Sequence, residues 1–96
     1  MNIQIEFIGF PLIYDLFPEG LHPFSFSGNR LMQLVEDLIA RHGARVKESL
    51  SDPGKNSLDP AIQIMINKKL ILKIKISEQR IEEGDQITFL KLLAGG

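Results

Sequence analysis

The sequence opens with apolar and polar residues in alternation over residues 2–7. A period of two residues predicts a half-buried strand. Alternation resumes over residues 22–27, after a turn that carries Pro and Gly at residues 18–20. The two segments are therefore expected to pair as a hairpin. The apolar segment 12–17 between them is ambiguous in type.

A helix is expected from Leu31, because apolar residues then follow at offsets of three and four as far as Ile39. Residues 27–29, Ser-Gly-Asn, supply short side-chain oxygens that suit a helix N-cap. Gly43 is expected to end the helix in a left-handed conformation. The segment 44–59 that follows has the composition of a polar, turn-rich loop.

Alternation returns in the second half of the chain. It runs over residues 62–66 and again over residues 70–76, with a turn at 67–69 between them. These two segments are expected to form a second hairpin. A turn at Gly84-Asp85 then leads into a last strand, in which Ile87 and Phe89 share one face.

The expected order is strand, strand, helix, loop, three strands and a tail. One main helix must then cover one face of a mixed sheet of about five strands. Apolar first and last strands suit the centre of such a sheet, paired in parallel. This is an α+β, β-grasp (ubiquitin-like) arrangement, with the domain over residues 1–93 and a flexible Ala-Gly-Gly tail over 94–96.

Composition and charge exclude several classes of function. A chain of 96 residues with net charge −1 has no segregated basic surface, so neither nucleic acid nor a membrane is an expected partner. The chain has no Cys, which excludes disulfides and thiolate metal sites and suits the reducing cytoplasm. His22 and His42 lack metal-site spacing, so no metal is expected. No catalytic Ser/His/Asp set or phosphate-binding loop appears.

The end of the chain carries the most specific pattern. A Gly84-Asp85 turn precedes Ile87 and Phe89, and the tail reads Ala94-Gly95-Gly96. This pattern resembles the MoaD/ThiS family of ubiquitin-like sulfur carriers. Asn67, after an alternating strand, resembles the Val-Asn hairpin of that family, and the resemblance extends over most of the chain.

Two branches of the family are open. The small subunit of molybdopterin synthase usually has Pro-Pro where this chain has Lys91-Leu92, whereas the thiamine sulfur carrier has no such prolines. The length of the chain and its long connection over 9–21 resemble the molybdopterin branch more closely. Molybdopterin-type cofactor biosynthesis is therefore the preferred pathway, and thiazole formation for thiamine is the alternative.

The resemblance implies a carrier rather than a free-standing enzyme. An adenylating, ubiquitin-activating-like enzyme would use ATP to activate the carboxylate of Gly96, and sulfur transfer would make a thiocarboxylate. A larger synthase subunit would then accept the sulfur, and the carrier itself binds no cofactor. Gly95 and Gly96 suit a narrow enzyme slot because glycine has no Cβ. Two further alternatives are a ubiquitin-like modifier conjugated through Gly96 and an interaction module with an inert tail.

The segment that leads into the tail is the expected partner-binding surface. It comprises Phe89, Leu90, Lys91, Leu92, Leu93 and Ala94. Exposed apolar residues often mark a partner surface. The alternative is that segment 12–17 covers this face. Lysines 68, 69, 73 and 75 form a further cluster, which is either a solvated face or a docking surface.

Overall fold

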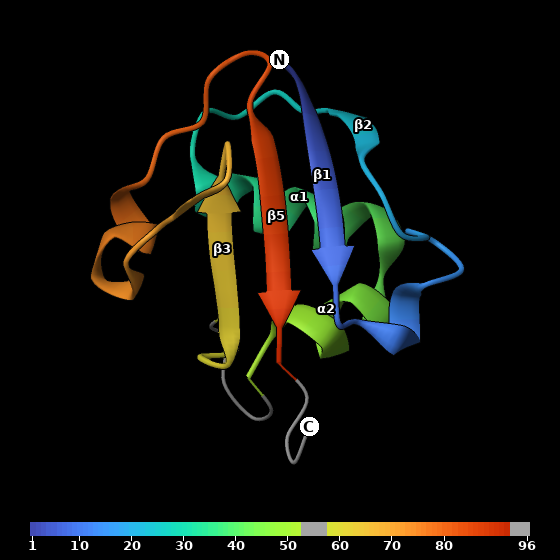
Figure 1. Ribbon diagram of the computed structural model, residues 1–96. Helices are drawn as coiled ribbons and strands as arrows, with labels where there is room; N and C mark the ends of the chain where they lie inside the picture. The colour runs from blue at the N-terminus through green and yellow to red at the C-terminus, as the bar shows by residue number, and fades with distance from the viewer. Residues whose placement is uncertain (53–57, 93–96) are drawn as a thin grey trace.

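The computed structural model describes residues 1–52 and 58–92. Strands and helices follow the order of a β-grasp domain, with short 3₁₀ helices labelled η (Figure 1). None of the helices in this part of the chain is long and apolar enough to cross a membrane. The elements are β1 (Asn2–Ile8), η1 (Pro11–Ile13), β2 (His22–Ser25), α1 (Leu31–His42), α2 (Ala44–Leu50), β3 (Ile62–Ile66), β4 (Lys69–Leu70), η2 (Lys73–Glu78) and β5 (Gln86–Lys91).

The sheet has five strands in the order β2-β1-β5-β3-β4. The first and last strands pair in parallel at its centre, with Ile5 opposite Ile87 and Phe7 opposite Phe89. The other neighbouring strands are antiparallel. The mixed β-grasp sheet expected from the sequence is therefore confirmed, including its central parallel pair.

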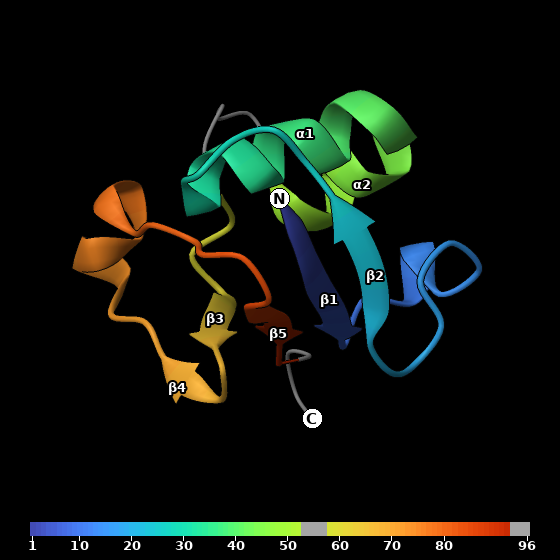
Figure 2. The same cartoon turned by 90° about the horizontal axis from the view of Figure 1, so that it is seen from above.

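The hydrophobic core lies between this sheet and the two helices, which cover one face of it (Figure 2). Ile5, Phe7, Ile87 and Phe89 point into the core and are almost inaccessible to solvent. The rings of Phe7 and Phe89 stack with their centroids 4.9 Å apart. The two central strands are thus joined by side-chain packing as well as by hydrogen bonds.

Helix α1 begins and ends close to its predicted bounds, but its N-terminal cap differs from the prediction. The side-chain Oε1 of Gln33 accepts hydrogen bonds from the backbone N–H groups of Asn29 and Arg30, at 2.9 and 3.0 Å. A side chain from inside the first turn therefore reaches back to the entry of the helix. Gly43, with φ of +79°, ends the helix as expected.

The predicted loop over 44–59 is wrong at its start, because residues 44–50 form α2. Val46 and Leu50 lie four residues apart and are both buried, so they anchor the short helix against the core. The turn-rich residues 53–57 of that prediction lie outside the described residues. Two helices rather than one therefore cover the sheet, with α1 as the main one.

The predicted second hairpin is present as β3 and β4, but the extent of its second strand, predicted over 70–76, is wrong. Strand β4 ends at Leu70 and the chain then forms η2, whose Ile76 is buried. In the observed hairpin register, a strand that continued past residue 73 would face residues 59–61. There Pro60 has no N–H to donate, and the backbone turns, with Ile62 N–H bonded to the carbonyl of Asp59.

The ambiguous segment 12–17 belongs to the helix side of the molecule. Ile13 and Phe17 are buried in the core, and η1 packs against α2. The aromatic ring of Phe17 contacts that of Phe7. The segment therefore leaves the middle of the opposite, open face of the sheet uncovered, and Tyr14 lies at the β1 side of that face.

Candidate functional site

Strand β5 leads into the expected tail, and the structure separates the predicted site residues along it. Phe89 is fully buried against Phe7, so it supports the strand from within the core. Leu90 is half-buried on the open face, and Leu92 is 68% exposed. Leu93, Ala94, Gly95 and Gly96 lie outside the described residues.

Lys91, the last residue of β5, is held by an ion pair. Its Nζ lies 2.9 Å from Oδ2 of Asp59, and both side chains are largely shielded from solvent. The other carboxylate oxygen of Asp59 accepts the N–H of Ala61 at 2.9 Å. This N–H first, and Lys91 second, hold the pKa of Asp59 below its usual range. The ion pair therefore joins the segment that precedes β3 to the end of β5.

Gly9, which follows β1, constrains the same end of β5 at Lys91. It has φ of +86°, and a Cβ at this position would lie 2.1 Å from the carbonyl oxygen of Lys91. Only a residue without a side chain permits this approach. The end of β1 thus lies directly against the end of β5.

The start of β5 is braced by the two motif residues that the sequence singled out. Asn67 donates its side-chain Nδ2–H to Oδ1 of Asp85 at 3.0 Å and accepts the backbone N–H of Gln86 at 2.9 Å. The other carboxylate oxygen of Asp85 accepts the N–H of Glu82 at 2.9 Å. The β3–β4 turn and the Gly84-Asp85 turn therefore form one hydrogen-bonded unit, which sequence spacing did not reveal.

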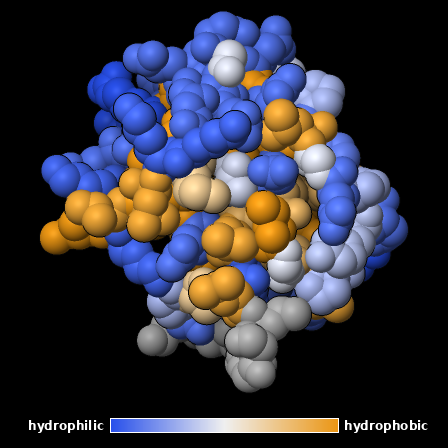
Figure 3. Space-filling view, in the orientation of Figure 1, coloured by the Kyte–Doolittle hydropathy of each residue, from blue (hydrophilic) through white to orange (hydrophobic). Residues whose placement is uncertain are grey.

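An apolar patch lies on the open face of the sheet, next to the end of β5. Ile8 is paired with Leu90 across β1 and β5, and Met65 with Leu70 across β3 and β4. Ile8 and Leu70 are 44% and 55% exposed. In Figure 3 apolar surface spreads over the middle of this face and reaches its left edge. We call Ile8, Met65, Leu70 and Leu90 the open-face patch.

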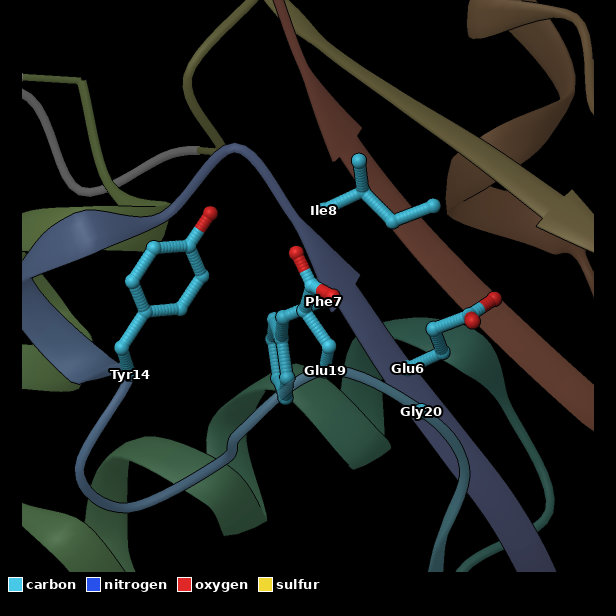
Figure 4. Close-up of a pocket in the computed structure, with 6 residues that line it drawn as sticks. All are labelled: Glu6, Phe7, Ile8, Tyr14, Glu19 and Gly20. Carbon is cyan, nitrogen blue, oxygen red and sulfur yellow. The ribbon is translucent and has the colours of Figure 1, made fainter.

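A small pocket of about 290 Å³ opens at the β1 side of this patch. Tyr14 and Glu19 come from the connection between η1 and β2, while Glu6 and Ile8 extend from β1 towards β5 (Figure 4). Glu6 accepts a hydrogen bond from the hydroxyl of Thr88 at 3.1 Å. The pocket is acidic and partly aromatic, but it contains no nucleophile with a neighbouring base.

Neither histidine is placed for metal binding. His22 donates its Nε2–H to the carbonyl of Pro18 at 2.6 Å, and the ring of His42 packs edge-on against Phe17. Within residues 1–52 and 58–92, no group of three or more His, Asp or Glu side chains gathers in a way that would hold a metal ion.

No protein-family profile matches the chain, and no curated protein matches it either. Solved structures with the same fold are found over nearly the full length. The small archaeal modifier protein 1 from Methanosarcina acetivorans has 19% identity and a TM-score of 0.75, over 99% of this chain and 96% of that one.

Two further neighbours were solved as complexes. The Amycolatopsis orientalis BexX/CysO complex matches with 22% identity and a TM-score of 0.69, over 98% of this chain and 99% of that one. The complex of subunits 1 and 2 of molybdopterin-converting factor from Helicobacter pylori matches with 23% identity and a TM-score of 0.56, over the full length of both chains. At these identities the likeness shows a shared ubiquitin-like β-grasp fold, consistent with the resemblance to MoaD/ThiS carriers.

Proposed function

We propose that the chain is a sulfur-carrier protein that works through the carboxylate of Gly96. The observation that carries the proposal is the position of β5. It is the middle strand of a β-grasp sheet, it is held at both ends, and the sequence Ala94-Gly95-Gly96 follows it within a few residues. The domain then acts as a rigid handle for a short reactive segment.

The proposed chemistry starts from a poor electrophile. An α-carboxyl group has a pKa of about 3.3–3.7, so the terminal carboxylate is ionised at neutral pH. Its oxygen attacks the α-phosphate of ATP on a partner enzyme, which forms an acyl-adenylate and releases pyrophosphate. A reduced sulfur donor then displaces AMP, and the carbonyl carbon of Gly96 gains a C–S bond. ATP belongs to the activating enzyme, and the carrier needs no cofactor of its own.

The surface beside the end of β5 suits a protein partner. Ile8, Leu90 and Leu92 present apolar area there, and such area gains free energy when a partner removes it from water. The adenylating enzyme would use this surface while Gly95 and Gly96 enter its active site. A larger synthase subunit would use it again when sulfur is delivered.

We place the carrier in molybdopterin-type cofactor biosynthesis. The support is the full-length likeness to a chain of the Helicobacter pylori molybdopterin-converting factor complex, together with the length of the first connection. Thiazole formation for thiamine is the alternative. Loaded carrier should supply sulfur to a pterin synthase in vitro, and activity with a thiazole synthase alone would reverse the assignment.

The test of the carrier function is a mass measurement on the full chain. With the activating enzyme, ATP and a sulfur donor, the intact protein should gain about 16 Da as one carboxylate oxygen is replaced by sulfur. Deletion of Gly96 should abolish this gain and leave the thermal midpoint unchanged, because Gly96 lies beyond the last strand. A wild-type chain that stays unmodified under these conditions would refute the proposal.

Protein modification is a second candidate. It is favoured by the full-length likeness to small archaeal modifier protein 1. The adenylate of Gly96 would then be attacked by a lysine amine of a target protein, with AMP leaving and an isopeptide bond formed. Branched peptides that carry Gly95-Gly96 on lysine, found in proteins conjugated in the native cell, would support this use of the same tail.

A further inference from the structure

The edge of the sheet formed by β4 and the start of η2 exposes several large apolar side chains. Leu70, Leu72 and Ile74 are 55%, 62% and 83% exposed, whereas Ile76 just after them is buried. We call residues 68–75 the β4–η2 ridge. In Figures 1 and 2 the η2 region projects from the side of the domain, away from β1 and β2.

Four lysines surround these apolar side chains, at positions 68, 69, 73 and 75, and all of them are exposed. The ion pairs among the described residues use other cations, namely Arg41, Arg45 and Lys91. The four lysines are therefore a local concentration of positive charge outside these ion pairs, on a chain whose net charge is −1, and of them Lys73 also acts electrostatically on the carboxylate of Asp59. The charge of the ridge is available to an acidic partner.

Protection of a sheet edge explains only part of this composition. Lysines at positions 68 and 69 flank the exposed edge of β4, where they discourage unwanted strand pairing. Leu72 and Ile74 lie beyond the strand, where no ladder needs protection. Their exposure leaves apolar area in water that a partner would cover.

The ridge is continuous with the open-face patch. Leu70 belongs to both surfaces and pairs with Met65, which in turn is paired with Thr88 of β5. In Figure 3 apolar surface lies over the middle of the open face and at its left edge. A partner docked at the base of the tail meets the ridge as the next exposed surface.

A hollow beside the ridge would receive side chains from such a partner. It has a volume of about 360 Å³ and is mainly apolar, with a single lysine and a single aspartate in its wall. The ridge thus supplies projecting apolar groups, an adjacent apolar hollow and a rim of cations. The hollow is lined by Met32, Leu58, Asp59, Pro60, Ile62, Lys73, Ile76 and Ser77.

We propose that the β4–η2 ridge is a second docking surface for the activating enzyme, on which it meets an acidic surface with apolar side chains. This inference rests on the proposed function for the identity of the partner. Burial of Leu72 and Ile74 would supply affinity, while the lysines would speed association and reject basic surfaces. The ridge then selects the partner, and the tail performs the chemistry.

The test is the affinity of the full chain for the purified activating enzyme from the same cell, measured by calorimetry without ATP. The charge reversal Lys73→Glu/Lys75→Glu should weaken binding at least about tenfold, and Leu72→Ser/Ile74→Ser should do the same. Matched controls lie away from the ridge. Leu21→Ser removes another exposed apolar side chain, 43% exposed, just before β2, and Lys47→Glu reverses a charge on α2.

Several outcomes would overturn the ridge as a docking surface. Ridge variants that bind as tightly as the wild type, or a wild-type chain that does not bind the enzyme, would each do so. Ridge-dependent binding to vesicles of phosphatidylserine and phosphatidylcholine, with unchanged affinity for the enzyme, would assign the ridge to a lipid surface instead. If the wild-type chain binds the enzyme through the ridge but is never adenylated, the ridge is still a docking surface and the carrier function is refuted.

Discussion

Replacement of Gly9 by alanine tests the contact that fixes the end of β5. The site imposes two separate penalties on a side chain. Its φ of +86° is disfavoured for an L-residue by about 1–2 kcal/mol. Its Cβ would also lie 2.1 Å from the carbonyl oxygen of Lys91, far below the 3.0 Å that real Cβ atoms keep. That overlap must be relieved by movement of one central strand against the other.

Gly20 separates the two penalties. It has φ of +107°, and a Cβ there would meet nothing within 4 Å. Gly20→Ala should therefore cost only the backbone term, about 1–2 kcal/mol. Gly9→Ala adds the disruption of packing and pairing at the end of the parallel strands, for a total of about 3 kcal/mol or more.

Urea unfolding monitored by circular dichroism gives the free energy of unfolding of both variants, and a thermal melt gives their midpoints. For a domain of this size each kcal/mol lowers the thermal midpoint by about 4–8 °C, so Gly9→Ala should melt about 12 °C or more below the wild type. Equal losses for Gly9→Ala and Gly20→Ala would show that the carbonyl of Lys91 does not constrain residue 9. The inference that the close approach of Gly9 to Lys91 fixes the end of β5 would then be wrong.

Two further substitutions test the supports of β5. Asp59→Asn should lower the free energy of unfolding by about 1 kcal/mol at neutral pH. The pKa of Asp59 is lowered in the folded state, so this difference between wild type and variant should shrink near the ordinary pKa of 3.8 and vanish as pH falls through the folded pKa. A difference in unfolding free energy that stays constant down to about pH 2 would contradict this. Asn67→Ala should cost about 2–3 kcal/mol, since two hydrogen bonds are lost and φ is +51°, and Asn67→Gly should cost about 1 kcal/mol less. Equal losses in chemical denaturation would mean that backbone strain plays no part.

The central features of the fold were predictable because their patterns are long and consistent. Alternation in the first and last strands indicated that both have one buried face, and their apolar composition indicated a central, parallel pair. The stripe of α1 was equally clear, since Leu31, Leu34 and Leu38 are almost inaccessible to solvent. These elements form the core, where periodicity and burial coincide.

The errors fall where a short pattern depends on tertiary contacts. Helix α2 has only Val46 and Leu50 as a clear apolar pair, which is too little to distinguish a short helix from a loop. The alternation over 70–76 gave the wrong element because a strand needs a partner as well as a pattern. Strand β3 begins at Ile62, so the far end of a longer β4 would have had no ladder.

The contacts that support β5, which leads to the proposed site, were only partly predictable. The expected turns at Asn67 and Gly84-Asp85 are present, while the predicted tail over 94–96 lies outside the described residues. The side-chain hydrogen bond from Asn67 to Asp85 joins residues that are 18 apart in sequence. The Lys91–Asp59 ion pair likewise appears only when the strands are aligned. Local patterns do not specify such long-range partners.

The parallel pairing of β1 with β5 also determines how the domain carries mechanical load. The two strands point the same way, and the N-terminus lies at the end of β1 opposite to the point where β5 ends (Figure 1). A force that pulls the N-terminus and the end of β5 apart therefore acts along the strands. It stretches the evenly spaced hydrogen bonds between them together, in shear, instead of unzipping them one by one. The domain should therefore resist unfolding when a partner pulls on the segment after β5. Its lifetime under that force is set by the unfolding rate of the whole sheet.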